Sequence, residues 1–142
     1  MHLLLKNGEK VKATYRSKES LKKAEKVFAS YNASKLLDQI QWVKADVTDY
    51  FSLQDIFEDV THVYHCAAVV SFDRRKADSM YEVNVKGTKN MVNLSMEHKI
   101  EKFCHVSSVA SLGKYADDRC TDEEAIWTHS DETSYYSITK YY

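Results

Sequence analysis

The feature that most restricts the fold of this chain is a regular alternation of short apolar segments with longer segments of helical periodicity. Four segments have the length and composition of strands, and they cover residues 10–16, 40–47, 61–70 and 102–108. Strands that alternate with helices in this way favour a parallel sheet covered by helices on both faces. We therefore predict an α/β fold with a doubly wound parallel sheet, in which ligands bind at the carboxyl ends of the strands.

Apolar residues recur at helical spacing between these segments. On the first complete helix, the apolar face is expected to contain Leu21, Ala24, Phe28 and Tyr31. Residues 114–132 are polar and show no periodicity. In chain order, we expect the end of a helix over residues 3–6 closed by Gly8, a helix from Lys18, a helix marked by Leu53, Ile56, Phe57 and Val60 whose start Thr48 or Asp49 can cap, a long helix over residues 78–98, and a helix from Ser134.

The charge balance argues against two classes of partner. The chain has 20 Lys and Arg residues against 21 Asp and Glu residues, so its formal net charge is −1. Such a balance predicts neither nucleic acid nor a membrane surface as a partner. No apolar run approaches the ~18 residues of a membrane span, and we expect a cytoplasmic protein.

The cysteines and histidines show no metal-binding pattern. His65 and Cys66 are neighbours on one predicted strand, and Cys104 and His105 are neighbours on another. Neither pair belongs to the C-x-x-C or H-x-x-x-H spacing that would support a zinc site. We predict no metal site, and we interpret His65 as a hydrogen-bonded residue of the core.

The most informative segment for chemistry is "SYYSITKYY", residues 134–142. On a helix, residues four apart face the same side, about 40° from each other, whereas residues five apart diverge by about 140°. Lys140 therefore projects beside Tyr136 rather than Tyr135. A free tyrosine titrates near ~10, and a nearby ammonium favours the phenolate, which makes a tyrosine a usable acid or base. Taken alone, this spacing also suits half-buried tyrosines beside a solvated lysine.

Other motifs accompany this pair. "ADV" ends the second predicted strand, "NVKG" lies in the long helix, and "VSSVASLG" follows the fourth strand at residues 106–113. In this order the motifs resemble the extended short-chain dehydrogenase/reductase family, which includes sugar-nucleotide epimerases and dehydratases, dihydroflavonol-type reductases and 3β-hydroxysteroid dehydrogenases. The resemblance covers nearly the whole chain, and its motifs are specific in combination. It implies that residues 1–142 are a partial NAD(P)-binding domain with a Rossmann-like sheet.

The resemblance implies an oxidoreductase site formed by Ser108, Tyr136 and Lys140. Such a site transfers hydride between a nicotinamide and a carbonyl or alcohol substrate. Ser108 would bond the reacting oxygen, with Ser107 as its competitor, and Tyr136 would exchange the proton. Lys140 would also hold the nicotinamide ribose. In the other interpretation, the two serines only satisfy backbone groups at the end of a strand.

The resemblance also implies where a dinucleotide binds, at the ends of the strands and in the long helix. Besides Tyr136 and Lys140, the expected contacts are Asp46 and Val47 at the adenine, Ala67, Ala68 and Val69 at a turn of small residues, and Asn84 near the active site.

Arg16 ends the first predicted strand and bears on the choice of cofactor. An arginine in this region suits a 2′-phosphate, whereas an acidic residue suits a free ribose 2′-hydroxyl. With Lys18, Lys22 and Lys23 nearby, Arg16 favours NADP(H), and NAD(H) is the alternative. The other interpretation is a charged strand end beside a solvated helix face.

Glycine and proline are scarce. The chain has three glycines and no proline, where average usage gives roughly ten and roughly seven. The family begins with a strand, a glycine-rich phosphate loop and a helix, and it continues beyond the lysine helix. We therefore expect the middle fragment of a dehydrogenase, without the first strand and the C-terminal region, which alone is neither active nor a stable monomer. In a longer protein, the helices at residues 78–98 and from Ser134 are candidates for a homodimer interface.

Several functions remain open at this point. A carbonyl, steroid or dihydroflavonol-type reductase is favoured, because "TYRSKES" is similar to the reductases and "VSSVASLG" lacks the Ala-Thr-Val-Tyr-Gly sequence of epimerases. The alternatives are a sugar-nucleotide epimerase or dehydratase, a non-catalytic dinucleotide-binding protein, and a nonfunctional gene fragment.

Overall fold

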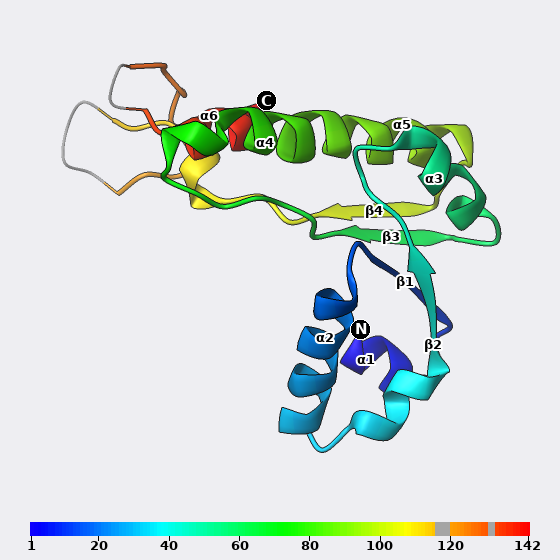
Figure 1. Ribbon diagram of the computed structural model, residues 1–142. Coiled ribbons are helices and arrows are strands. Elements are labelled where there is room, and N and C mark those ends of the chain that lie inside the picture. Colours follow the sequence, from blue (N-terminus) through cyan, green and yellow to red (C-terminus); the bar gives the residue numbers. More distant parts are fainter. Residues whose placement is uncertain (116–119, 131–132) are drawn as a thin grey trace. The chain divides into compact units, whose positions relative to one another are not determined.

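The computed structural model describes residues 1–115, 120–130 and 133–142 (Figure 1). The chain divides into two compact units, Met1–Ile56 and Phe57–Tyr142. Each unit contains one pair of parallel strands together with helices. The α/β class and the parallel pairing predicted from the sequence are therefore confirmed.

The first unit is built around two parallel strands, with Val11 opposite Ile40 and Tyr15 opposite Lys44. A 3₁₀ segment, Ser34–Gln39, leads into the second strand, and another, Asp55–Phe57, follows the last helix. The other elements of this unit are α1 (His2–Lys6), β1 (Val11–Tyr15), α2 (Lys18–Ser30), β2 (Ile40–Lys44) and α3 (Tyr50–Gln54).

The core of this unit joins α1, α2 and the two strands. Its buried members are Leu5, Ala13, Phe28, Ala33 and Ile40. The predicted apolar face of α2 is confirmed at Phe28 and wrong at Tyr31. Tyr31 caps the end of α2, where its ring stacks on His2 at 5.2 Å and stays mostly exposed. A residue beyond the last helical turn no longer follows the helical periodicity that the prediction assumed.

The end of α1 shows why a glycine is needed there. Gly8 has a φ of +81°, a left-handed conformation that side chains rarely adopt. Its N–H donates to the carbonyl of Leu5 at 3.1 Å, and the N–H of Glu9 donates to the carbonyl of Leu4 at 3.0 Å. These two bonds form a Schellman motif, and they satisfy carbonyls that the helix leaves open. The predicted role of Gly8 is confirmed.

The start of α3 separates the two predicted caps. The carboxylate of Asp49 accepts a hydrogen bond from the N–H of Ser52 at 3.3 Å, so Asp49 is the cap. Thr48 donates both its N–H and its hydroxyl to Asp46 instead. The helix itself is shorter than predicted, because it tightens into the 3₁₀ segment after Gln54.

The second unit is built around another parallel pair, with His62 opposite Lys102 and His65 opposite His105. α5 packs on β3, and in Figure 1 the run from α4 to α5 lies along one face of the two strands. Its elements are β3 (His62–His65), a 3₁₀ turn (Arg74–Lys76), α4 (Ala77–Met80), a π-helical segment (Tyr81–Gly87), α5 (Thr88–Glu97), β4 (Lys102–His105), a 3₁₀ turn (Val109–Ser111) and α6 (Tyr135–Tyr141).

The long helix predicted over residues 78–98 is an unbroken helical run over residues 77–97 with a π-helical segment in its middle. Such segments widen the helix locally, and they occur frequently at functional sites. Asn84 lies inside this segment and is buried, with 6% of its surface exposed. The spacing of apolar residues in the sequence could not reveal this widening, because the widening is a change in the backbone hydrogen bonding of the helix.

The four strands are shorter than predicted at their carboxyl ends, and they form two separate two-stranded sheets, β1–β2 and β3–β4. The sequence analysis predicted a doubly wound sheet that lacks its first strand. The partial sheet therefore agrees with the incomplete doubly wound fold predicted from the sequence. Residues 45–47, 66–70 and 106–108, which follow the strands, carry many of the predicted site residues.

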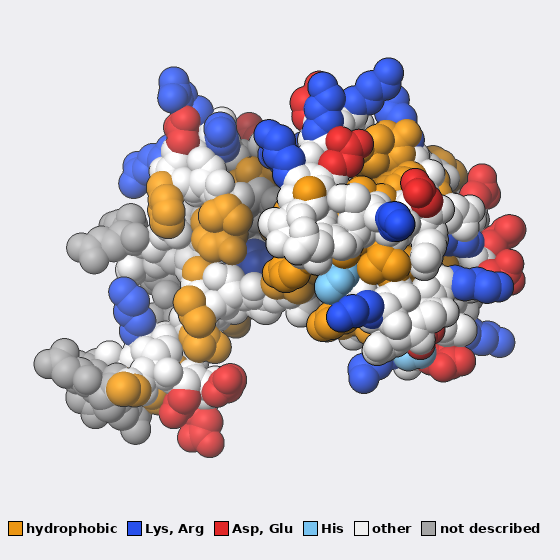
Figure 2. All heavy atoms as spheres, turned by 90° about the horizontal axis from the view of Figure 1, so that it is seen from below, with side chains coloured by type: hydrophobic (Ala, Val, Ile, Leu, Met, Phe, Trp, Pro, Cys, Tyr) orange, Lys and Arg blue, Asp and Glu red, His pale blue; other side chains and the backbone are white. Residues whose placement is uncertain are grey.

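The surface carries both signs of charge. Figure 2 shows basic and acidic side chains interspersed over one face of the molecule, as the net charge of −1 implies. Within residues 1–115, 120–130 and 133–142, no helix combines the length and the apolar character needed to span a bilayer.

His65 is a buried titratable residue of the second unit, with 2% of its surface exposed. Its Nε2 lies 2.9 Å from the hydroxyl of Thr88 on α5, which confirms the predicted core role. The pKa of His65 is lowered from its ordinary 6.5 to about 4, chiefly by burial and to a smaller extent by the electrostatic effects of His105 and Lys140.

Acid should therefore destabilise the folded protein through His65. Between pH 6.5 and about 4 the unfolded chain binds the proton that folded His65 excludes, so the free energy of unfolding falls as the pH is lowered through this window. The loss should reach about 3 kcal/mol once the pH lies below both values. Urea unfolding at pH 7, 6 and 5, in a polypeptide that carries these residues as a cooperatively folded domain, measures it. His65→Asn, which keeps a hydrogen-bonding group, should flatten this dependence, and an unchanged slope would contradict the assignment.

Candidate active site and cofactor-binding site

The helix that carries Tyr136 and Lys140 begins as predicted. Ser134 is its cap, and the hydroxyl of Ser134 accepts a hydrogen bond from the N–H of Ser137 at 3.1 Å. α6 then runs to Tyr141, so Tyr136 and Lys140, four residues apart, lie on one side of it. Tyr136 is half-buried, whereas Tyr135 is exposed.

Two side chains of α6 fasten this helix to the segment after β4. The ammonium of Lys140 donates to the carbonyl of Val106 at 2.9 Å, and the hydroxyl of Ser137 donates to the carbonyl of Ala110. Those two carbonyls stand on either side of Ser107 and Ser108 in the chain. The Ser-Ser segment and the Tyr-Lys helix are therefore held together at both ends of the Ser-Ser segment.

The two serines have different surroundings. Ser108 is half-buried, and its hydroxyl oxygen accepts the N–H of Ala110 at 3.2 Å, which caps the 3₁₀ turn. Because a hydroxyl that accepts still has a proton to donate, Ser108 can also bond a substrate oxygen. Ser107 is exposed, and its oxygen lies 3.3 Å from the hydroxyl of Ser111. The capping role that the sequence offered as the other interpretation is present at Ser108, and it leaves the hydroxyl proton available.

Asn84 connects the turn after β3 to the same helix. Its side-chain oxygen accepts the N–H of Val69 at 2.7 Å, and its side-chain nitrogen donates to the carbonyl of Val69 at 2.9 Å. The same nitrogen donates to the hydroxyl of Thr139 on α6 at 3.0 Å. Ala67 and Ala68, which precede this clamped residue, are exposed, and their small side chains leave the backbone accessible. The turn thus presents open backbone from a fixed position.

One cation and two imidazoles meet near the ends of β3 and β4. The rings of His65 and His105 stack with their centroids 5.3 Å apart. Burial lowers the pKa of His105 below its ordinary value, and the ammonium of Lys140 lowers it further. Since both histidines are held neutral, Lys140 is the permanent positive charge among the three residues at neutral pH.

The first unit carries the predicted adenine and phosphate contacts at the ends of β1 and β2. Arg16 Nη1 lies 3.8 Å from Asp46 Oδ2, and the Arg16 side chain is 63% exposed. Asp46 also accepts the N–H and the hydroxyl of Thr48 at 3.0 and 2.9 Å. Val47, beside Asp46, is half-buried. Carboxyl ends of parallel strands are where dinucleotides bind in sheets of this class, and these residues lie there.

Sequence reasoning missed the residues that hold the site in place. Ser137 and Thr139 fix α6, and Thr88 partners His65, yet none of the three belongs to a chemical motif. Gly113 is also needed in its place, because a Cβ atom there would overlap the backbone carbonyl of Ile126. For Ser137 and Thr139, the one signal in the sequence is their position on the same short helix as Tyr136.

The described residues contain no group of three or more His, Cys, Asp and Glu side chains that could hold a metal ion. Cys66, Cys104 and Cys120 are exposed free thiols.

Comparison with known proteins identifies the family. Residues 1–142 match the NAD dependent epimerase/dehydratase family. The chain is 31% identical over 84 residues to a putative dihydroflavonol 4-reductase of Synechocystis sp., covering 59% of this chain and 24% of that protein. It is 27% identical over 131 residues to cinnamoyl-CoA reductase 1 of Petunia hybrida, covering 91% of this chain and 37% of that protein.

A solved structure shows the same fold. Yeast methylglyoxal/isovaleraldehyde reductase Gre2, complexed with NADPH, superposes with a TM-score of 0.73 at 19% identity, covering 98% of this chain and 44% of that one. The chain thus spans between a quarter and two fifths of the length of the two relatives in sequence. Because the match extends over every residue, the chain belongs to the NAD dependent epimerase/dehydratase family.

Proposed function

We propose that residues 1–142 are the middle part of an NAD(P)-dependent oxidoreductase that reduces a carbonyl compound or oxidises the corresponding alcohol. The observation that carries the proposal is the pair of bonds from Lys140 and Ser137 to the carbonyls of Val106 and Ala110. These bonds bring the helix of Tyr136 to the segment of Ser108. The similarity to two reductases in sequence supports a reductase over an epimerase or dehydratase.

Each of the two units has groups at its strand ends that suit a part of a dinucleotide. Exposed backbone at Ala67 and Ala68 permits close approach of a cofactor, and Val69 behind them is fixed by Asn84. Arg16 offers exposed donors at the end of β1, where a ribose or its 2′-phosphate would be held. When bound, the nicotinamide supplies or accepts the hydride.

Residues of this chain would then bind the reacting oxygen and transfer the proton. Ser108 donates its free hydroxyl proton to the reacting oxygen and so positions it. Tyr136 gives that oxygen its proton during reduction, and it takes the proton back during oxidation. Lys140 has three N–H donors and uses one on Val106, so two remain for a ribose hydroxyl.

The proposal is tested by the oxidation of NADPH and of NADH with a panel of aldehydes and ketones, using the complete protein that carries residues 1–142. Turnover with a carbonyl compound supports the reductase. Interconversion of sugar nucleotides without net cofactor oxidation would support the epimerase alternative. Cofactor binding without turnover of either kind would point to a non-catalytic dinucleotide-binding protein.

The first prediction concerns the acid/base residue. Tyr136→Phe should abolish reduction and leave cofactor affinity nearly unchanged, because it removes only the hydroxyl that carries the proton. Tyr135→Phe is the matched control and should be mild, since Tyr135 lies on another side of α6. Initial rates and dinucleotide titrations measure both variants. Inactivation by Tyr135→Phe with a harmless Tyr136→Phe would reverse the assignment.

The second prediction concerns the two serines. Ser108→Ala should lower kcat by about a hundred-fold, the cost of removing one hydrogen-bond donor from the reacting oxygen. Ser107→Ala should leave kcat within a few-fold, because its hydroxyl faces Ser111 and solvent. Steady-state kinetics on both variants decide the matter, and equal losses would show that neither hydroxyl has the special role.

The third prediction concerns the cofactor, and we propose NADP(H) over NAD(H). Arg16→Ala should weaken NADP(H) binding about ten-fold, the lower end for a charge-assisted hydrogen bond at an exposed site. NAD(H) binding should be almost unchanged. Asp46→Asn keeps the acceptor for Thr48 but removes the charge facing Arg16, so it should preserve or improve NADP(H) affinity. If Arg16→Ala lowered the affinity for NADP(H) and for NAD(H) equally, Arg16 would not recognise the 2′-phosphate.

A further inference from the structure

A small pocket lies beside the start of α6, and no predicted site residue accounts for it. Its volume is about 200 Å³. The segment after β3 supplies Phe72 and Arg74, the end of α4 supplies Met80, and the start of α6 supplies Tyr135. Tyr135 directly precedes the tyrosine proposed to move the proton. A ligand in this pocket would therefore contact the residue that adjoins the proposed acid/base in the chain.

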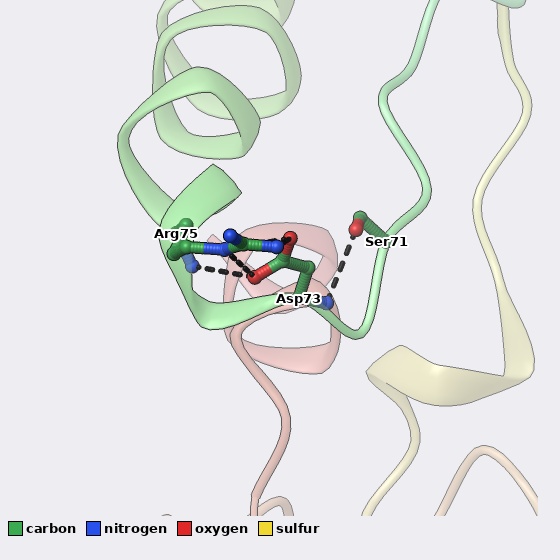
Figure 3. A network of polar contacts seen from close by, with 3 residues as sticks. All are labelled: Ser71, Asp73 and Arg75. Carbon is green, nitrogen blue, oxygen red and sulfur yellow. Dashed lines mark hydrogen bonds and ion pairs between the residues drawn. The ribbon is translucent and has the colours of Figure 1, made fainter.

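A local network of hydrogen bonds, shown in Figure 3, pairs the acidic side chain of the pocket with an arginine. Asp73 accepts three hydrogen bonds from the guanidinium of Arg75, at 3.0 Å from Nε to Oδ1, 3.2 Å from Nε to Oδ2 and 2.9 Å from Nη2 to Oδ2. It also accepts the N–H of Arg75, while its own N–H donates to the hydroxyl of Ser71 at 3.1 Å. The bonds from Arg75 lower the pKa of Asp73, so its carboxylate stays charged and paired. The acid of the pocket is thus neutralised by Arg75.

Arg74 is the other charged residue that lines the pocket, and its charge is available to a ligand. Among the residues that the structure describes, no hydrogen bond or ion pair engages its guanidinium. The turn that carries it is fixed by Asp73 on its amino side, since Asp73 caps the 3₁₀ segment from Arg74 to Lys76. An exposed guanidinium with unused donors can bind a carboxylate through two parallel hydrogen bonds.

The apolar and aromatic residues that line the pocket determine which uncharged part of a ligand can bind. Phe72 and Tyr135 are exposed and Met80 is fully buried. Two exposed aromatic side chains and an apolar residue in one lining suit a flat apolar group. Pockets for drug-sized ligands measure roughly 300 to 1,000 Å³, so a volume of about 200 Å³ admits a single ring or a short chain.

We propose that this pocket receives the end of the carbonyl substrate remote from the reacting carbon, and that Arg74 selects substrates whose remote end bears a carboxylate. The proposal rests on the proposed reductase function and adds its substrate class: a small acidic aldehyde or ketone with a ring-sized apolar body.

The test compares 4-carboxybenzaldehyde with benzaldehyde as substrates of the complete protein. The unsubstituted protein should show the lower KM for 4-carboxybenzaldehyde. Arg74→Gln should raise that KM about ten-fold and leave the KM for benzaldehyde and both kcat values unchanged. Lys76→Gln removes the same charge two residues away, outside the pocket lining, and should change neither KM. Arg74→Lys should recover part of the preference. Equal KM values in the unsubstituted protein, or equal shifts in the two glutamine variants, would overturn the inference.

A binding measurement separates this inference from the proposed function. Calorimetric titration with 4-carboxybenzaldehyde in the absence of a dinucleotide reports the pocket without turnover. Binding that is lost in Arg74→Gln, in a protein that reduces neither aldehyde, would sustain the pocket and overturn the reductase. Reduction of both aldehydes with binding indifferent to Arg74 would sustain the reductase and overturn the pocket.

Discussion

The second unit depends on one buried amide. Asn84 holds both backbone polar groups of Val69 and, through the same nitrogen, the hydroxyl of Thr139. One side chain of the long helical run therefore holds both the turn after β3 and the helix α6. Its amide supplies both an acceptor and two donors, which an aspartate or a leucine of similar size does not. Because the site is buried, an unmatched group there costs the full penalty of desolvation.

The proposed active site is fixed mainly by residues outside the proposed chemistry. Thr139, Ser137 and Lys140 fasten one helix to three different carbonyl or amide groups, and of the three only Lys140 has a proposed role in the reaction. Preorganisation of this kind is what oriented hydroxyl groups require, since a misplacement of about 1 Å can cost a hundred-fold in rate. The rings of His65 and His105 stack on each other, and because both are neutral at neutral pH they place no second positive charge beside Lys140.

Local signals in the sequence predicted the fold class and several exact ends of elements, and tertiary polar contacts were beyond them. The glycine at the end of α1 and the serine that caps α6 act within a few residues, so their roles can be read directly. The bond from Asn84 to Thr139 joins residues 55 positions apart, and no periodicity encodes it. The placement of Tyr136 and Lys140 on one side of α6 followed from helical geometry. The pairing of Arg16 with Asp46 joins neighbouring strands, and only their register reveals it.

The bond from Lys140 to Val106 gives that lysine two duties that cannot be separated by deleting it. Its ammonium is both the proposed electrostatic partner of the tyrosine and the tether of α6 to the end of β4. A loss of activity in a variant without the amine would thus mix a chemical defect with a displaced helix. In genetic terms, the position is doubly constrained, so a substitution tolerated by the fold alone or by the chemistry alone would still be rejected.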